Sequence, residues 1–135
     1  MSNSSDYSRV YVIAELSANH GGSVAHALEM VRHAHACGAD AVKIQTYTAD
    51  TLTLNCDAAP FRIAGGTLWD GQTLHQLYHA AHTPWDWHAA IFAEAKTLGL
   101  DCFSTPFDET AVDFLETFNP PFYKIASFEL THLPL

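Results

Sequence analysis

The stretch AVKIQTY, residues 41–47, decides how the chain folds. It is rich in β-branched and aromatic residues, which favours a buried β-strand, and the polar Lys43 and Gln45 lie toward its end. Runs of the same kind are VYVIAEL (10–16), DCFSTPF (101–107) and FYKIASFE (122–129). We therefore predict four strands, each of them ending in polar residues.

Helix-like stretches separate these runs. Ser23 and Thr83 are suited to cap the starts of two helices, and Gly38 and Gly99 are suited to end them. The predicted helices span roughly residues 24–37, 74–82, 84–98 and 108–118. The stretch 48–73 is too long for an ordinary connection between a strand and a helix, so we interpret it as a functional loop or lid on the active face.

The alternation of strands and helices is typical of parallel βα units. It predicts an α/β fold of the (β/α)8, or TIM, barrel type, of which this chain supplies about the first four βα units. A closed barrel needs eight strands, and half a barrel would expose strand edges. We therefore expect a fragment: a disordered polar leader over residues 1–9, then the first half of a barrel over 10–135.

Polar residues follow every predicted strand, at the end where the chemistry of parallel βα folds gathers. Burying many polar groups together is unfavourable unless they bind something, so the set predicts a ligand site. Any single member could equally be a capping or solvated residue. Only six Lys and Arg occur in the whole chain, and two of them belong to this set. Its members are Glu15, Lys43, Gln45, Ser104, Thr105, Lys124, Ser127 and Glu129.

Composition limits the possible partners. The formal charge of −9 and the pI near 5.2 argue against a nucleic-acid or polyanionic partner, and no apolar run is long enough for a membrane helix. The three cysteines are odd in number and widely spaced, which indicates a reducing, cytoplasmic location. Cys37 lies in the apolar stripe of the first helix, so we expect it in the core.

Four strings carry a family resemblance: IAELSANHGGS, GADAVKIQTYT, FSTPFD and YKIASFE. They resemble the N-terminal half of the sialic acid synthase family, from Val10 to the last residue. Around Asp57, 66–69, 77–78 and 83–85, the chain is most similar to the pseudaminic acid synthases of that family. Legionaminic and N-acetylneuraminic acid synthases share the strand-end motifs and remain alternatives.

The resemblance implies that phosphoenolpyruvate condenses with a 2,4-diacetamido-2,4,6-trideoxy hexose and that phosphate is released. It implies that Lys43 and Lys124, with hydroxyls of Thr105 or Ser104 and of Ser127, contact phosphate and carboxylate groups. The corresponding carboxylate near the enolpyruvyl group is Glu15, and the amino-sugar contacts are Gln45 and Glu129. Asn19 and His20 follow Glu15 and either line the pocket or brace the loop.

The resemblance further implies a divalent metal, Mn or Mg, whose histidine ligands lie outside this chain, together with a homodimer and a C-terminal antifreeze-like domain that the chain lacks. We therefore expect the 135 residues alone to have little or no activity. Within the chain, His75, His79 and His82 share one predicted helical face. Such a cluster is either a solvated face or, less commonly, a metal site.

Two other classes of function remain open. The first is a lysine aldolase on the same barrel, in which Lys124 forms a Schiff base and the charge of Lys43 lowers its pKa. The second is a non-catalytic half-barrel that pairs with another copy or another chain through its open strand edges.

Overall fold

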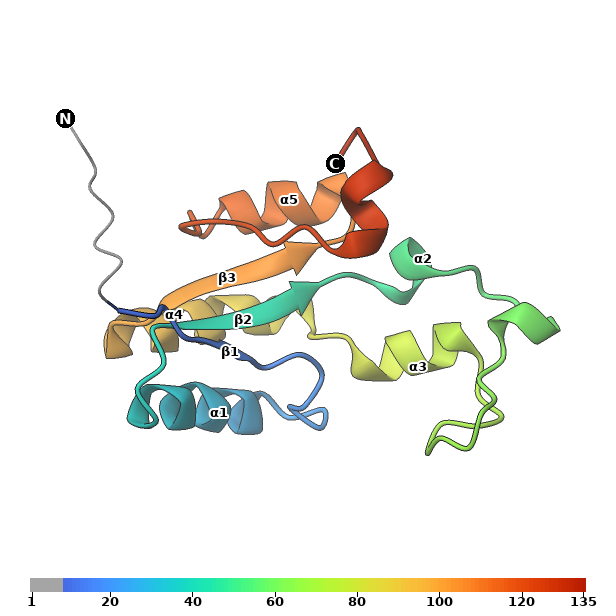
Figure 1. Ribbon diagram of the computed structural model, residues 1–135, viewed down its shortest axis with the longest axis horizontal. Helices are drawn as coiled ribbons and strands as arrows, with labels where there is room; N and C mark the ends of the chain where they lie inside the picture. Colours follow the sequence, from blue (N-terminus) through green and yellow to red (C-terminus); the bar gives the residue numbers. More distant parts are fainter. Residues whose placement is uncertain (1–8) are drawn as a thin grey trace.

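A parallel β-sheet with the strand order β1-β2-β3 organises the computed structural model, which describes residues 9–135 (Figure 1). Its strands are β1 (Ile13–Glu15), β2 (Ala41–Thr46) and β3 (Asp101–Pro106). The register aligns Glu15 with Lys43, and Gln45 with Thr105. The carboxyl ends of all three strands therefore lie at the same edge of the sheet, as predicted for parallel βα units.

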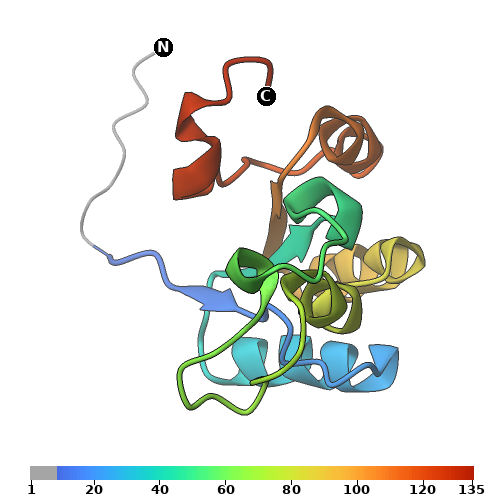
Figure 2. The same ribbon diagram turned by 90° about the vertical axis from the view of Figure 1, so that its right-hand side faces the viewer.

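Helices lie mainly on one side of this sheet. Figure 2 shows α1, α4 and α5 on that side and the short helix η3 on the other. The α-helices are α1 (Val24–Ala36), α2 (Ala49–Leu52), α3 (Leu74–Ala81), α4 (His88–Leu98) and α5 (Glu109–Glu116). The 3-10 helices are η1 (Ala59–Phe61), η2 (Trp85–Trp87) and η3 (Ser127–Thr131).

The predicted helix boundaries are confirmed at most ends. The Ser23 hydroxyl accepts a hydrogen bond from the His26 amide at 3.3 Å and caps α1. Gly99 ends α4 at φ +75°, in the left-handed region that favours glycine. The helix predicted from Pro84 differs at its start, because its first turn is the 3-10 helix η2 and α4 begins only at His88.

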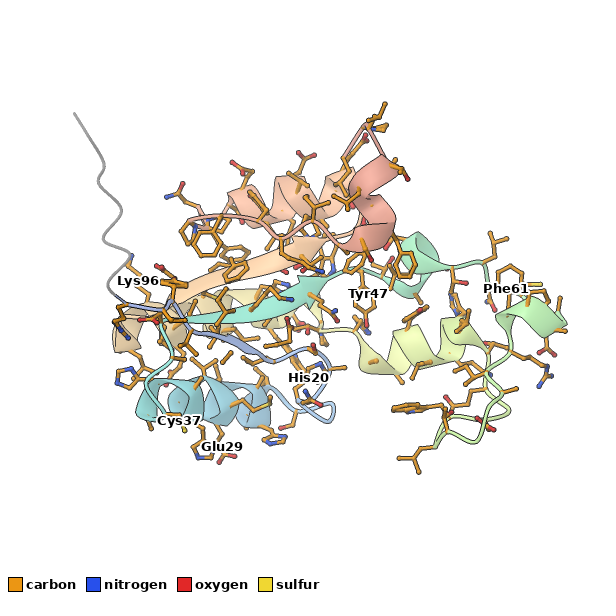
Figure 3. All side chains as sticks on the ribbon, viewed as in Figure 1. His20, Glu29, Cys37, Tyr47, Phe61 and Lys96 are labelled. Carbon is orange, nitrogen blue, oxygen red and sulfur yellow. The ribbon has the colours of Figure 1, made fainter. Side chains whose placement is uncertain are left out.

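The main core lies between the sheet and the helices α1 and α4. Val31 of α1, Ile44 of β2 and Ile91 of α4 are each no more than 1% exposed. The prediction that Cys37 belongs to this core is wrong, because Cys37 is exposed. It is the C-cap of α1, where the helix ends and no longer turns its apolar face toward the sheet (Figure 3).

The fourth predicted strand, 122–129, does not form. Its backbone makes one hydrogen bond to β3, from the Lys124 amide to the Ser104 carbonyl at 3.2 Å, and from Ser127 the chain turns into η3. A strand needs a repeated ladder of such bonds, and β-propensity alone does not supply one. Phe122 instead packs on Phe103 with ring centroids 4.3 Å apart.

The first strand is shorter than its apolar run predicts. Only Ile13–Glu15 pairs with β2, while the amide of Val12 donates to the Asp40 carboxylate at 2.8 Å. Of the predicted leader, residues 1–8 lie outside the described residues. Arg9 forms an ion pair with Asp40 at 2.6 Å. Backbone bonding nevertheless continues one residue before the strand, because the Val12 carbonyl accepts from the amides of Asp40 and Ala41 at 2.8 and 3.2 Å.

The long stretch 48–73 contains more structure than a plain loop. It includes α2 and η1, and an isolated antiparallel bridge joins Arg62 to Thr73. The Asp70 carboxylate accepts bonds from the Thr67 hydroxyl and from the amides of Thr67, Gly66 and Gly65, which lower the pKa of Asp70 to about 2. The turn 65–70 is therefore held by a charged group that stays ionised.

Across residues 9–135, no helix combines the length and the apolar character that crossing a membrane requires.

Replacement of Ile91 tests the assigned core. Ile91→Ala should lower the free energy of unfolding by about 2 to 5 kcal/mol, because it leaves a cavity between α4 and the sheet. The matched control Leu54→Ala, at a residue that is 69% exposed, should change it by less than about 0.5 kcal/mol. Urea unfolding followed by circular dichroism measures both, and equal losses would contradict this core.

Candidate functional site

Three of the predicted residues meet at the carboxyl ends of the strands. Lys43 of β2 forms an ion pair with Glu15 of β1, and its ammonium donates to the Thr105 hydroxyl of β3 at 3.4 Å. The side chain of Lys43 is 13% exposed and that of Glu15 is 38% exposed. A largely buried ammonium that is shared between a carboxylate and a hydroxyl is suited to bind an anion that approaches from the open side.

A tight turn after β1 holds the Glu15 carboxylate. Ser17 lies in the left-handed region at φ +46°, and both its amide and its hydroxyl donate to Glu15 Oε1, at 3.1 and 2.9 Å. A residue other than glycine rarely adopts this conformation, and such strain persists only where the surroundings enforce it. One carboxylate oxygen is thus fixed by Ser17 while the other faces Lys43.

A pocket of about 400 Å³ opens beside this cluster. Glu129 lines this pocket, and its buried Oε2 has no hydrogen-bond partner within residues 9–135. Burial raises the pKa of Tyr47 to about 12, which keeps its phenol neutral at the end of β2 (Figure 3). The pocket is lined by Gln45, Tyr47, Leu52, Tyr78, Phe107, Phe128 and Glu129. It combines two polar groups with an aromatic wall.

Lys124 and Ser127 lie at the margin of this site. Both residues are exposed, and Lys124 forms no salt bridge with another described residue. The bond from the Lys124 amide to the Ser104 carbonyl nevertheless holds this segment beside β3. The segment therefore starts next to Thr105, although it is not a strand.

Ser104 is separated from the other predicted residues. It is fully buried on the helix side of β3, where its hydroxyl is 2.7 Å from Thr46 Oγ1. Neighbouring residues of a strand point to opposite faces, so Thr105 faces the cluster and Ser104 cannot. The resemblance left Thr105 and Ser104 as alternatives, and the geometry favours Thr105 and corrects the assignment of Ser104.

Asn19 and His20 brace the loop after β1. Asn19 donates from its side chain to the Leu16 carbonyl at 3.1 Å, and His20 Nδ1 accepts from the Gly22 amide at 3.1 Å. His20 is 3% exposed and packs edge-on against Trp87, with ring centroids 5.3 Å apart. Burial lowers its pKa, so the ring is neutral near pH 7. These contacts brace the loop, whereas His20 Nε2 is buried and has no hydrogen-bond partner within residues 9–135.

The histidines of α3 do not gather around one point. His75 Nε2 is 2.8 Å from the Asp50 carboxylate, while His82 Nδ1 bonds to the carbonyl of His79. Within the part of the chain that the structure describes, no three His, Cys, Asp or Glu side chains form a group that could hold a metal ion. The residues described here do not by themselves fit the divalent metal that the resemblance implies.

Sequence reasoning missed most of the pocket wall. Tyr78 of α3 and Phe107 after β3 both pack edge-on against Tyr47, with centroid distances of 6.1 and 5.5 Å. Tyr47, the aromatic residue at the end of the stretch 41–47, could have indicated an aromatic pocket wall at this position. Nothing in the local sequence of α3 indicates that Tyr78 meets it.

These features define an α/β protein with a parallel sheet that carries its charged and polar groups at the carboxyl ends of the strands. The chain belongs to the NeuB family, whose model matches residues 30–135.

Similar proteins support this membership. The chain is 54% identical over 121 residues to the pseudaminic acid synthase of Campylobacter jejuni and 48% identical over 124 residues to that of Helicobacter pylori. It is 35% identical to the N,N'-diacetyllegionaminic acid synthase of Legionella pneumophila. These matches cover 90%, 92% and 92% of this chain, and 35%, 36% and 35% of the relatives. The chain thus spans about a third of the length of the relatives that it matches.

A solved structure shows the same fold. The N-acetylneuraminic acid synthetase of Leptospira borgpetersenii, in complex with citrate, superimposes with a TM-score of 0.74 at 23% identity. The match covers 93% of this chain and 39% of that one. At this identity the comparison concerns the α/β fold alone.

The buried His88 should make the stability of the fold depend on pH. Burial lowers the pKa of folded His88 from its usual 6.5 to about 4, so below pH 6.5 the unfolded chain takes up the proton first. The stabilisation is present above about pH 6.5 and is lost as the pH falls toward 4. The difference in unfolding free energy between the wild type and His88→Gln should therefore shrink by about 3 kcal/mol from pH 7 to pH 4.

Urea unfolding of both proteins at several pH values measures this difference. His20, whose pKa is also lowered, is present in both proteins and cancels. A difference that does not change with pH would show that His88 titrates normally in the folded chain.

Proposed function

We propose that this chain forms part of a synthase that condenses phosphoenolpyruvate with a 2,4-diacetamido-2,4,6-trideoxy hexose to make pseudaminic acid and phosphate. The observation that carries the proposal is the Glu15–Lys43–Thr105 cluster beside the pocket that contains Gln45 and Glu129, in a chain 54% identical to a pseudaminic acid synthase. The sheet would be the first part of a (β/α)8 barrel, with residues 10–135 supplying its N-terminal half.

The anionic substrate would bind at the cluster. Lys43 is largely buried and already bonded to the Thr105 hydroxyl, so it can donate to a phosphate or carboxylate without losing a large hydration shell. Lys124 and the Ser127 hydroxyl are exposed on the segment beside β3 and would supply further donors. Lys43, which is paired with Glu15, is suited to act as a fixed cation.

Glu15 would act at the enolpyruvyl group. Because Ser17 fixes one carboxylate oxygen and Lys43 faces the other, Glu15 has a defined orientation. A carboxylate held in this way can orient a water molecule toward the carbon that it attacks, or relay a proton.

The amino sugar would occupy the adjoining pocket. Gln45 can donate and accept hydrogen bonds, and the unpartnered Glu129 Oε2 can accept one from a hydroxyl or an amide of the sugar. The aromatic wall of Tyr47, Tyr78 and Phe107 offers apolar contact to methyl and acetyl groups. A pseudaminic acid precursor is favoured over a legionaminic acid precursor by the relatives, at 54% against 35% identity.

The complete reaction would need segments beyond these residues. Because the chain spans about a third of its relatives, we propose that later segments hold the divalent metal, Mn or Mg, and that the full enzyme is a cytoplasmic homodimer. The chain alone would then be inactive or nearly so.

Phosphate release tests the proposal. The chain is assayed alone and mixed with the part of the Campylobacter jejuni synthase that follows its match to this chain, with phosphoenolpyruvate, Mn²⁺ and either the trideoxy sugar or N-acetylmannosamine. We expect release only from the mixture, and faster release with the trideoxy sugar. A folded mixture that releases no phosphate with either sugar, or a borohydride-trapped adduct on Lys124, would overturn the proposal.

Removal of one positive charge should affect phosphate release on the site side of the sheet but not on α4. Lys43→Met should lower phosphate release by about 100-fold or more, because it removes a preorganised donor to the anionic substrate. The control Lys96→Met removes an exposed charge on α4 and should leave the rate within about twofold. Initial rates of the mixture measure both variants, and equal rates for the two would show that Lys43 does not bind the substrate.

A further inference from the structure

A buried polar network lies directly behind the proposed site. Thr46 Oγ1 is 2.8 Å from His88 Nε2 and 2.7 Å from Ser104 Oγ, and His88 Nδ1 is 3.2 Å from the Pro84 carbonyl. Thr46, His88 and Ser104 are all fully buried. The network joins β2, β3 and the start of α4 within an otherwise apolar layer.

The chemistry of these groups fixes which atom donates and which accepts in each hydrogen bond of the network. The Pro84 carbonyl can only accept, so His88 Nδ1 carries the proton and Nε2 is the acceptor. Thr46 therefore donates to Nε2, and its oxygen accepts from the Ser104 hydroxyl. Each of the three side chains is then a fixed donor or acceptor. A surface hydroxyl that rotates freely would have no such fixed bonds.

The network is aligned with the residues that face the site. Thr46 directly follows Gln45, Ser104 directly precedes Thr105, and Gln45 and Thr105 are register partners on neighbouring strands. The same side-chain bonds therefore fix the two strand ends on the helix side while Gln45 and Thr105 point to the other side.

Aromatic contacts extend the network to the rest of the helix layer. The His88 ring lies edge-on against Phe114 of α5 at 5.2 Å, and Trp85 stacks on Phe114 at 4.7 Å. Trp85 Nε1 also donates to the Tyr47 carbonyl at 3.4 Å, so the residue after Thr46 is held by the same helix start. His88 thus lies where β2, β3, α4 and α5 meet.

We propose that Thr46, His88 and Ser104 form a positioning unit that sets the orientation of Gln45 and Thr105 across the sheet. None of the three faces the pocket or the cluster. They act through the backbone of the two strand ends, and the catalytic consequence of this positioning rests on the proposed function.

Isosteric replacement of Thr46 tests the proposal in the chain itself. Thr46→Val keeps the shape but removes the hydroxyl, so NMR relaxation should show a lower order parameter for the Gln45 side-chain amide and the Thr105 methyl. Thr46→Ser restores the hydroxyl and should restore both values. Ser104→Ala removes only the hydrogen bond between Ser104 and Thr46, so it should lower the order parameter of the Thr105 methyl by a smaller amount. The control Thr97→Val, which removes an exposed hydroxyl bonded within α4, should change neither value.

Kinetics of the mixture with the Campylobacter jejuni segment provide the second readout. Thr46→Val should lower kcat/KM for phosphoenolpyruvate by about 10-fold at a temperature where the variant is fully folded, and Thr46→Ser should recover it. A merely structural role would lower Tm and leave the kcat and KM of the folded protein unchanged. Order parameters and kinetics that match those of Thr97→Val would overturn the proposal.

The two proposals fail in different ways. If the wild-type mixture releases no phosphate, the proposed function fails, and the NMR measurement alone decides the positioning unit. If the wild type is active but Thr46→Val leaves the order of Gln45 and Thr105 unchanged, the positioning unit fails and the proposed function stands.

Discussion

The parallel pairing of β2 with β3 is the constraint on which the rest of the structure depends. Six residues of each strand are in register, and the pleat sends alternate side chains to opposite faces. Val42 and Ile44 therefore enter the apolar layer under α1 and α4, while Lys43 and Gln45 face the other side. A slip of one residue would exchange these sets and bury the lysine among aliphatic side chains.

Burial of charge explains why the polar residues occur together. An ammonium that is 13% exposed loses most of its hydration, which is unfavourable unless a carboxylate and hydrogen-bond acceptors replace the water. Glu15 and Thr105 supply these groups to Lys43 from the two neighbouring strands. The parallel register thus makes the cluster possible, since it aligns three strand ends at one edge.

Local sequence was enough to predict several elements, although the strands among them pair with residues far away in the sequence. The strands β2 and β3 and the helix α1 follow from strand propensity, apolar spacing and the Ser23 cap. The stretch 122–129 has equal β-propensity but forms no strand, because a strand also needs a neighbour that completes its ladder. The site was predicted as a set of polar strand ends, and the face to which Ser104 or Thr105 points was not, because it depends on the pleat.

The ends of β2 and β3 carry neutral polar groups on one face of the sheet and charged groups on the other. Behind the sheet, burial keeps His88 neutral, so it can accept a bond from Thr46 without introducing a charge into the apolar layer. In front, the charged Lys43 lies against Glu15, and in the adjoining pocket the buried Oε2 of Glu129 has no partner within the described residues. The neutral network is satisfied by its own hydrogen bonds and the Pro84 carbonyl, whereas a charged cluster beside a pocket with an unpartnered acceptor gains from a ligand. This difference is the physical reason to assign structural order to one face and binding to the other.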